Sequence, residues 1–135
     1  MDKVSKEWCS KSELSTVTRI VRYPVVDGES TAIKEIEVDI HIMPASYKKE
    51  LLRRTFVDEV EADDREKLFA AQTLYDELLV AYSLDLTHED VILMKSNKPL
   101  AFWDSLLMAV NKINSNLFSM TPEDMAEAKN RAAED

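Results

Sequence analysis

Alternating apolar and polar positions near the N-terminus predict a β-hairpin. One strand is expected over residues 31–42, where from residue 35 charged or polar positions alternate with the members of one apolar face: Ile36, Val38, Ile40 and Ile42. Residues 14–26 are rich in Val, Ile and Thr but alternate poorly, and Pro24 within them indicates an edge strand. Gly28, the only glycine in the chain, lies between the two segments in Asp27-Gly28-Glu29-Ser30 and predicts a tight turn with positive φ.

From residue 44 onward the apolar residues recur at helical spacing, and no further strand is indicated. The expected helices are, in chain order, residues 45–58, a longer helix that Asp63 or Asp64 caps, a short helix that Thr87 caps with Asp90 in its first turn, a helix opened by Pro99, and a weakly apolar helix from Thr121.

The predicted fold class is α+β, mainly α, with an N-terminal β-hairpin followed by a small helical bundle. A chain of 135 residues is long enough for one hydrophobic core and short for two. We therefore expect a flexible N-terminus over 1–13 and a single globular domain over 14–120. The hairpin takes up 14–43 of that domain and the helices 44–120, and residues 121–135 form a short helix and a frayed acidic tail.

The helix opened by Pro99 is apolar on more sides than one core requires. One stripe holds Leu100, Trp103, Leu107, Val110 and Leu117, with Asn114 in the position before Leu117, and a second holds Phe102, Leu106, Ala109 and Ile113. Either the helix is surrounded by the rest of its own chain, which is the more common arrangement, or one stripe faces a partner. The candidate partner-binding residues are Phe102, Trp103, Leu106, Leu107 and Val110. Six methionines would suit an adaptable contact surface.

Charge is distributed unevenly along the chain. The formal net charge is -9, yet residues 1–57 carry 10 basic and 9 acidic side chains while residues 58–135 carry 7 and 17. Such a surface repels nucleic acid, so no nucleic-acid partner is expected. The exception is a basic cluster, a second candidate partner-binding set that could contact the acidic part of another copy: Lys48, Lys49, Arg53 and Arg54.

Motifs that carry catalysis are missing from the sequence. A single glycine cannot build a phosphate-binding loop, and no GxSxG nucleophile elbow is present. Cys9, His41 and His88 have no metal-ligand spacing; His41 is expected on the polar face of its strand and His88 in a first helical turn. The acidic stretch 58–66 contains one ExxD pair, Glu61 and Asp64, and no ExxE partner. We expect no enzyme activity, no cofactor and no metal.

One cysteine excludes an intrachain disulfide, which fits a reducing cytoplasmic setting. No stretch reaches the roughly 18 uninterrupted apolar residues of a membrane span, and the N-terminus lacks the apolar run of a signal peptide. The expectation is a soluble cytoplasmic protein with no membrane partner.

A small, acidic, mostly helical chain with an N-terminal hairpin, no catalytic apparatus and a polar C-terminal tail resembles the tail assembly chaperones of long-tailed bacteriophages. The resemblance covers length, order of elements and overall character, and it involves no sharp motif. It implies a homo-oligomer that binds the tape measure protein before the tail tube forms and is absent from the finished particle. It transfers no site residues.

Members of that family typically occur in a short form and in a longer form made by a programmed ribosomal frameshift near the end of the first reading frame. Ala128-Lys129-Asn130 is compatible with a slippery GCA AAA AAC. The resemblance then implies that the tail of this chain is a linker to an extension that recruits tail tube protein.

Two alternatives stay open. The chain also resembles type III secretion chaperones, which are small, acidic client-holding dimers, although their helices flank a sheet formed later in the chain and here strand signals stop by residue 43. A metal-dependent helical hydrolase is the other alternative, and it depends on the acidic stretch 58–66 alone.

Overall fold

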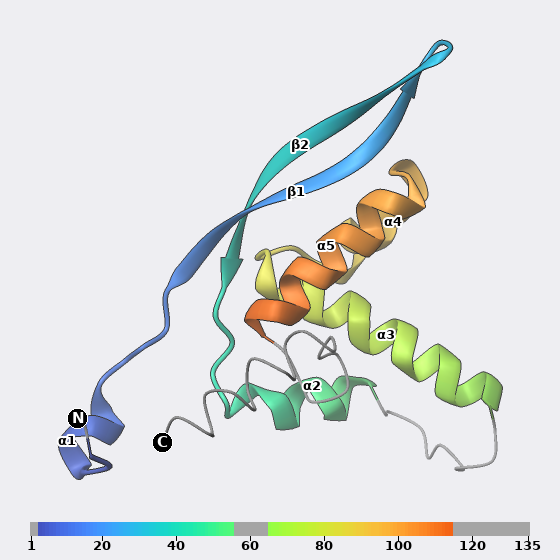
Figure 1. Ribbon diagram of the computed structural model, residues 1–135. Helices are drawn as coiled ribbons and strands as arrows, with labels where there is room; N and C mark the ends of the chain where they lie inside the picture. The colour runs from blue at the N-terminus through green and yellow to red at the C-terminus, as the bar shows by residue number, and fades with distance from the viewer. Residues whose placement is uncertain (1–2, 56–64, 115–135) are drawn as a thin grey trace, which may run out of the picture.

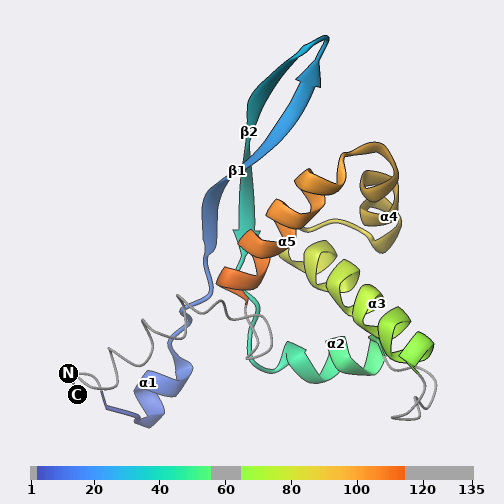
Figure 2. The same cartoon turned by 45° about the vertical axis from the view of Figure 1, so that its right-hand side comes forward.

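A computed structural model describes residues 3–55 and 65–114. Within them, a two-stranded antiparallel sheet precedes a set of helices, and helix α5 (Leu100–Ile113) lies between the sheet and helix α3 (Arg65–Ser83) (Figures 1 and 2). The predicted class, α+β and mainly α with an N-terminal hairpin followed by a helical bundle, is confirmed. The described part of the chain contains no helix with the length and apolarity that crossing a bilayer requires.

The hairpin consists of β1 (Thr16–Asp27) and β2 (Ser30–His41), paired without a bulge from Thr16 opposite His41 to Asp27 opposite Ser30. Gly28 has φ +65°, and Glu29 after it is not in the positive-φ region, which is the pattern of a type II′ turn. The Ser30 hydroxyl donates to the carbonyl of Asp27 across this turn. The predicted strand boundaries of 14–26 and 31–42 are therefore correct to within about two residues.

The helices in chain order are α1 (Lys6–Ser10), α2 (Tyr47–Thr55), α3 (Arg65–Ser83), α4 (His88–Asn97) and α5 (Leu100–Ile113). Four of the five expected helices are present. The fifth, expected from Thr121, lies outside the described residues, as do the capping candidates Asp63 and Asp64.

Helix α1 adds a short element to the N-terminal segment for which a flexible chain is expected. The Ser5 side chain accepts the backbone N–H of Trp8 and so caps the helix, but none of its residues is buried. The predicted cap of α4 is confirmed in full, because Thr87 Oγ1 accepts from the Asp90 N–H and the Asp90 carboxylate accepts from the Thr87 N–H.

One hydrophobic core joins the hairpin to the helices. The inner face of the hairpin packs on α5, where the rings of Tyr23 and Phe102 meet edge to face with centroids 5.0 Å apart. The buried members of this core are Val21, Tyr23, Ile40, Leu51, Leu78, Leu79, Val80, Ala81, Val91, Phe102, Leu106 and Val110. Since α3 contributes the longest run of these residues, it is the helix around which the other elements assemble.

Asn114, directly after α5, ties three elements together. Its side-chain oxygen accepts the N–H of Met43 at 2.7 Å, and its amide nitrogen donates to the carbonyl of His41 at 2.8 Å and to Ser83 Oγ at 2.9 Å. Ser83 is fully buried at the end of α3. A single amide therefore fixes the end of β2 against the ends of α3 and α5.

Replacing Asn114 by alanine is expected to lower the free energy of unfolding by about 2–3 kcal/mol, because three polar groups lose their partner and one of them is buried. Urea unfolding followed by circular dichroism measures this loss as a lower midpoint at an unchanged slope. Asn97→Ala is the matched control, because the exposed Asn97 amide bonds only the Leu93 carbonyl of its own helix, and a loss within about 0.5 kcal/mol is expected. Equal losses in the two variants would contradict the role given to Asn114.

Candidate functional site: a groove at the foot of the hairpin

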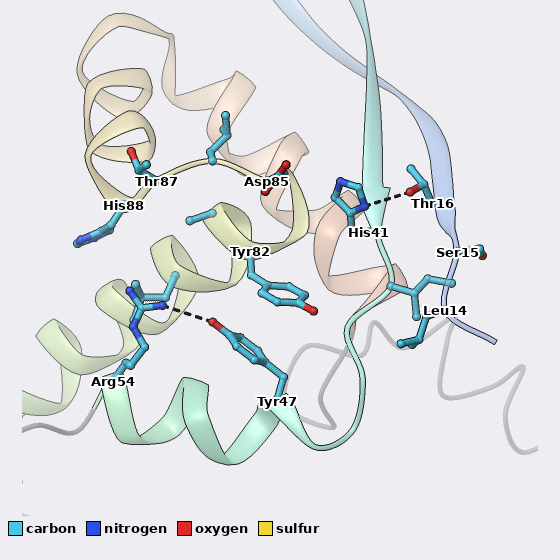
Figure 3. Close-up of a pocket in the computed structure, with 14 residues that line it drawn as sticks. Leu14, Ser15, Thr16, His41, Tyr47, Arg54, Tyr82, Asp85, Thr87 and His88 are labelled. Atoms are coloured by element: carbon cyan, nitrogen blue, oxygen red, sulfur yellow. Dashed lines mark hydrogen bonds between the residues drawn. The ribbon is translucent and has the colours of Figure 1, made fainter. Parts of the chain in front are cut away.

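A hollow with a volume of about 720 Å³ lies where the hairpin meets the helices. Segments far apart in sequence form its walls: the residues around the start of β1, the end of β2, α2, the end of α3 and the start of α4 (Figure 3). Its apolar lining comes from Leu14, Ile42, Leu78, Ala81 and Leu86. We refer to this hollow as the foot groove.

Two tyrosines form the aromatic part of the foot groove. The rings of Tyr47 on α2 and Tyr82 on α3 stack with centroids 4.1 Å apart and planes 28° apart. Arg54, seven residues further along α2 than Tyr47, donates from Nη1 to the Tyr47 hydroxyl at 3.3 Å (Figure 3). The result is a stacked aromatic pair with a guanidinium group beside it at the wall of the groove.

The turn after α3 shapes the wall opposite α2. Asp85 has φ 55°, the only positive value at a non-glycine residue among those described. The N–H of Leu86 bonds the carbonyl of Ala81 and the N–H of Asp85 bonds that of Tyr82, which is a Schellman motif with Asp85 in the left-handed position. Aspartate tolerates this conformation better than most residues. The chain therefore ends α3 sharply without a second glycine.

His41 and His88 reach the foot groove from β2 and α4, and each has a polar partner. His41 Nδ1 is 3.0 Å from Thr16 Oγ1, across the hairpin. His88 Nε2 is 3.0 Å from the Glu77 carboxylate of α3. As predicted, His41 lies on the polar face of its strand and His88 in a first helical turn.

Glu77 connects α3 with α4 beside the groove. Its carboxylate, 13% exposed, also accepts from Lys95 Nζ at 2.8 Å, and that ammonium lies 5.0 Å from the centroid of the Trp103 ring. Burial alone would raise the pKa of Glu77, but the hydrogen bonds from Lys95 and His88 outweigh it and the pKa is lowered. At the next residue toward the N-terminus, burial raises the pKa of Asp76 despite the hydrogen bond from Gln72 and the charge of Lys95.

Within residues 3–55 and 65–114, no three His, Cys, Asp or Glu side chains converge as metal ligands would. Glu61 and Asp64, on which the hydrolase alternative depends, lie outside the described residues.

The structure divides the α5 candidates between core and surface. Phe102, Leu106 and Val110 are buried in the core of the monomer, at 5%, 0% and 0% exposure. Trp103 and Leu107 pack against that core but stay partly exposed. Only these two of the five candidates have side-chain surface that a partner could contact without unfolding the chain.

The basic cluster on α2 is divided as well. Arg53 is paired with Glu50 of its own helix, and Arg54 bonds Tyr47 and lines the foot groove. Lys48 and Lys49 are exposed, and no polar partner is seen for either side-chain ammonium in the described part of the chain. Two of the four residues therefore carry charge that is free to meet an acidic surface.

No signal in the sequence indicates the foot groove itself. Tyr47 and Tyr82 belong to two separate apolar helix faces, and nothing in their spacing indicates that the rings stack. Comparison of the chain with protein-family models, with curated proteins and with solved structures gives no match in any of the three.

Two neighbouring carboxylates should respond in opposite ways when their charge is removed. Because the folded-state pKa of Glu77 is lowered, its contribution to stability is present at neutral pH and is lost as the pH falls through that pKa. Glu77→Gln should cost about 1–2 kcal/mol at pH 7, with a difference from wild type that shrinks toward pH 3. The raised pKa of Asp76 means that its charge opposes folding at pH 7, so Asp76→Asn should raise the melting temperature there and lose this advantage in acid.

Melting temperatures of the wild type, Glu77→Gln and Asp76→Asn between pH 3 and pH 7 test both predictions. The amide oxygen introduced by Asp76→Asn can still accept the Gln72 hydrogen bond, so this variant isolates the charge. Melting-temperature shifts of the same sign in the two variants at pH 7 would contradict the opposite pKa shifts assigned to Glu77 and Asp76.

Proposed function

We propose that this chain is a non-enzymatic assembly chaperone that self-associates and binds the tape measure protein during assembly of a phage tail. The class of protein is taken from the resemblance of the sequence to tail assembly chaperones in length, order of elements and overall character. The structural observation that supports the proposal is the apolar surface that the last two described helices, α4 and α5, leave exposed.

Four large apolar side chains of these two helices are exposed. Leu93 and Leu100 are 63% and 73% exposed, and Ile92 and Met108 are 46% and 54% exposed. These four, together with the partly exposed Trp103 and Leu107, form the α4–α5 apolar set. An amphipathic helix packs its apolar face into surfaces of this kind, and long helical clients such as tape measure proteins present such faces.

Self-association has a separate electrostatic basis in the proposal. Lys48 and Lys49 of one copy would contact acidic side chains of the next, and such a contact would weaken as salt screens the attraction between opposite charges. Recruitment of tail tube protein through a frameshifted extension belongs to the same proposal, and the Ala128-Lys129-Asn130 segment that motivates it lies outside the described residues.

A client-holding chaperone of the type III secretion kind is the second candidate, since it would use apolar surface in the same way. The order of elements argues against it, because here the sheet precedes every core-forming helix. A metal-dependent hydrolase would be favoured if magnesium or manganese raised the melting temperature, and a melting temperature indifferent to both ions would remove it.

Sedimentation velocity of the purified chain over a range of concentrations and salt tests the proposal. We expect association that grows with concentration and weakens with salt. The variant Leu93→Gln/Leu100→Asp should weaken co-sedimentation with tape measure segments at least tenfold at an unchanged melting temperature. An aspartate in the first turn of α5 suits the helix dipole, so the fold should tolerate it.

Phe69→Gln is the matched control, because Phe69 is 76% exposed near the start of α3 and is not a member of the α4–α5 apolar set. Its association and binding should equal those of the wild type. A chain that remains monomeric throughout and leaves tape measure segments unbound would contradict the proposal.

A further inference from the structure

The outer edge of β2 has unpaired backbone groups along most of its length. The Ile42 N–H bonds the Ser15 carbonyl directly opposite, so in this register the even-numbered residues of β2 bond β1. The odd-numbered residues from Thr31 to Asp39 consequently direct their N–H and C=O groups away from β1. The only strand beside β2 in the described structure is β1, and the turn end of the hairpin extends beyond the helices (Figures 1 and 2).

The two edges of the hairpin differ. On β1 the outward groups belong to even-numbered residues, and one of these is Pro24, which has no N–H. Proline at such a position prevents an added strand from forming a continuous ladder. The outer edge of β2 contains no proline, and its outward N–H and C=O groups continue from one end of the strand to the other.

An amide already binds the end of this edge in the way that an added strand would. The Asn114 side chain accepts from the N–H of Met43 and donates to the carbonyl of His41, which are successive outward groups in line with β2. The same pattern of groups continues at Asp39, Glu37 and Glu35, where no such amide is found among the described residues.

Three outer-face side chains along this edge are acidic. Glu35, Glu37 and Asp39 are exposed on the outer face of the hairpin. Arg22 Nε lies 2.9 Å from a carboxylate oxygen of Glu35, and the Thr18 hydroxyl donates to the Asp39 carboxylate at 2.6 Å. Glu37 lies opposite Ile20 and has no polar partner in the described residues. On the inner face, Ile36 and Val38 extend the apolar core toward the edge.

We propose that the outer edge of β2 binds an extended protein segment that alternates basic and apolar residues, which adds to the hairpin as a third strand. Its basic side chains lie beside Glu35, Glu37 and Asp39, and its apolar side chains continue the inner face. Pairing of two β2 edges from separate copies would place carboxylates against carboxylates, which disfavours a second copy as the occupant. This surface is distinct from the α4–α5 apolar set, and the inference does not depend on the assembly function.

The test is a titration of the whole chain with a seven-residue peptide that alternates lysine and valine, followed by amide chemical shifts and calorimetry. We expect saturable binding that shifts the amides of β2, weakens with salt and disappears when the lysines are replaced by glutamates. Methylation of alternate peptide nitrogens on the pairing edge should also abolish binding, because it removes the donors of the ladder.

A matched pair of proline variants locates the site. Ile20 and Glu37 face each other at a position where both N–H groups point outward, so Ile20→Pro and Glu37→Pro each remove one outward donor, from β1 and β2 respectively, without breaking a bond of the hairpin. Glu37→Pro should weaken peptide binding about fivefold or more, while Ile20→Pro leaves it within about twofold. Glu37→Gln separates charge from backbone and should cost less than the proline while reducing the salt dependence.

Each variant is first checked for wild-type circular dichroism and melting. Absence of peptide binding, equal effects of the two prolines, or equal affinity for the glutamate peptide would overturn the proposal. It would also be overturned if Glu37→Pro converted an oligomer to a monomer and the peptide had no effect, because the edge would then serve pairing between copies.

Discussion

The structure depends on the burial of one face of a two-stranded hairpin against α5. Two strands alone are marginal in water, because each side chain has few neighbours and both edges are solvated. Here Val21, Tyr23 and Ile40 are buried, with Phe102 of α5 packed edge to face on Tyr23. Without α5 the hairpin would have no apolar partner of comparable size. Without the hairpin, α5 would expose the face that it now buries.

Hydrogen bonds from two polar side chains hold the ends of the helices and of β2 together. The Asn114 amide connects β2 with α3 and α5, and Glu77 connects α3 with α4 through His88 and Lys95. Both side chains lie at the border of the core and are partly shielded from water. The foot groove lies between these two connections, so its walls are held at both ends by side-chain bonds rather than by packing alone.

Local features are predictable from the sequence, and long-range ones are not. The alternation in β2, the turn at Gly28 and the Thr87–Asp90 cap each depend on a few neighbouring residues, and the structure confirms all three. The core side of α5 is not predictable. Its two stripes are similarly apolar, and only contact with a hairpin far away in the chain shows that Phe102 and Leu106 are buried while Trp103 stays partly exposed.

The candidate site shows the same limit. In the sequence Arg54 is one of four similar basic residues, but its bond to Tyr47 and its place in the foot groove depend on how α2 packs against α3. Asn114 stands out in the sequence only as a polar residue within an apolar stripe. A polar residue at such a position is itself a signal of a specific partner, but the sequence does not identify the backbone groups that it binds.

The pairing of the hairpin with α5 also has a consequence during synthesis of the chain. Protein chains emerge from the ribosome N-terminus first, so the hairpin is available long before α5 has been made. Its turn and register are local and can form early, but Tyr23 has no ring to pack on until Phe102 emerges. The apolar inner face of the hairpin therefore stays exposed until α5 has emerged, and the nascent chain completes the hairpin side of its core only at that point.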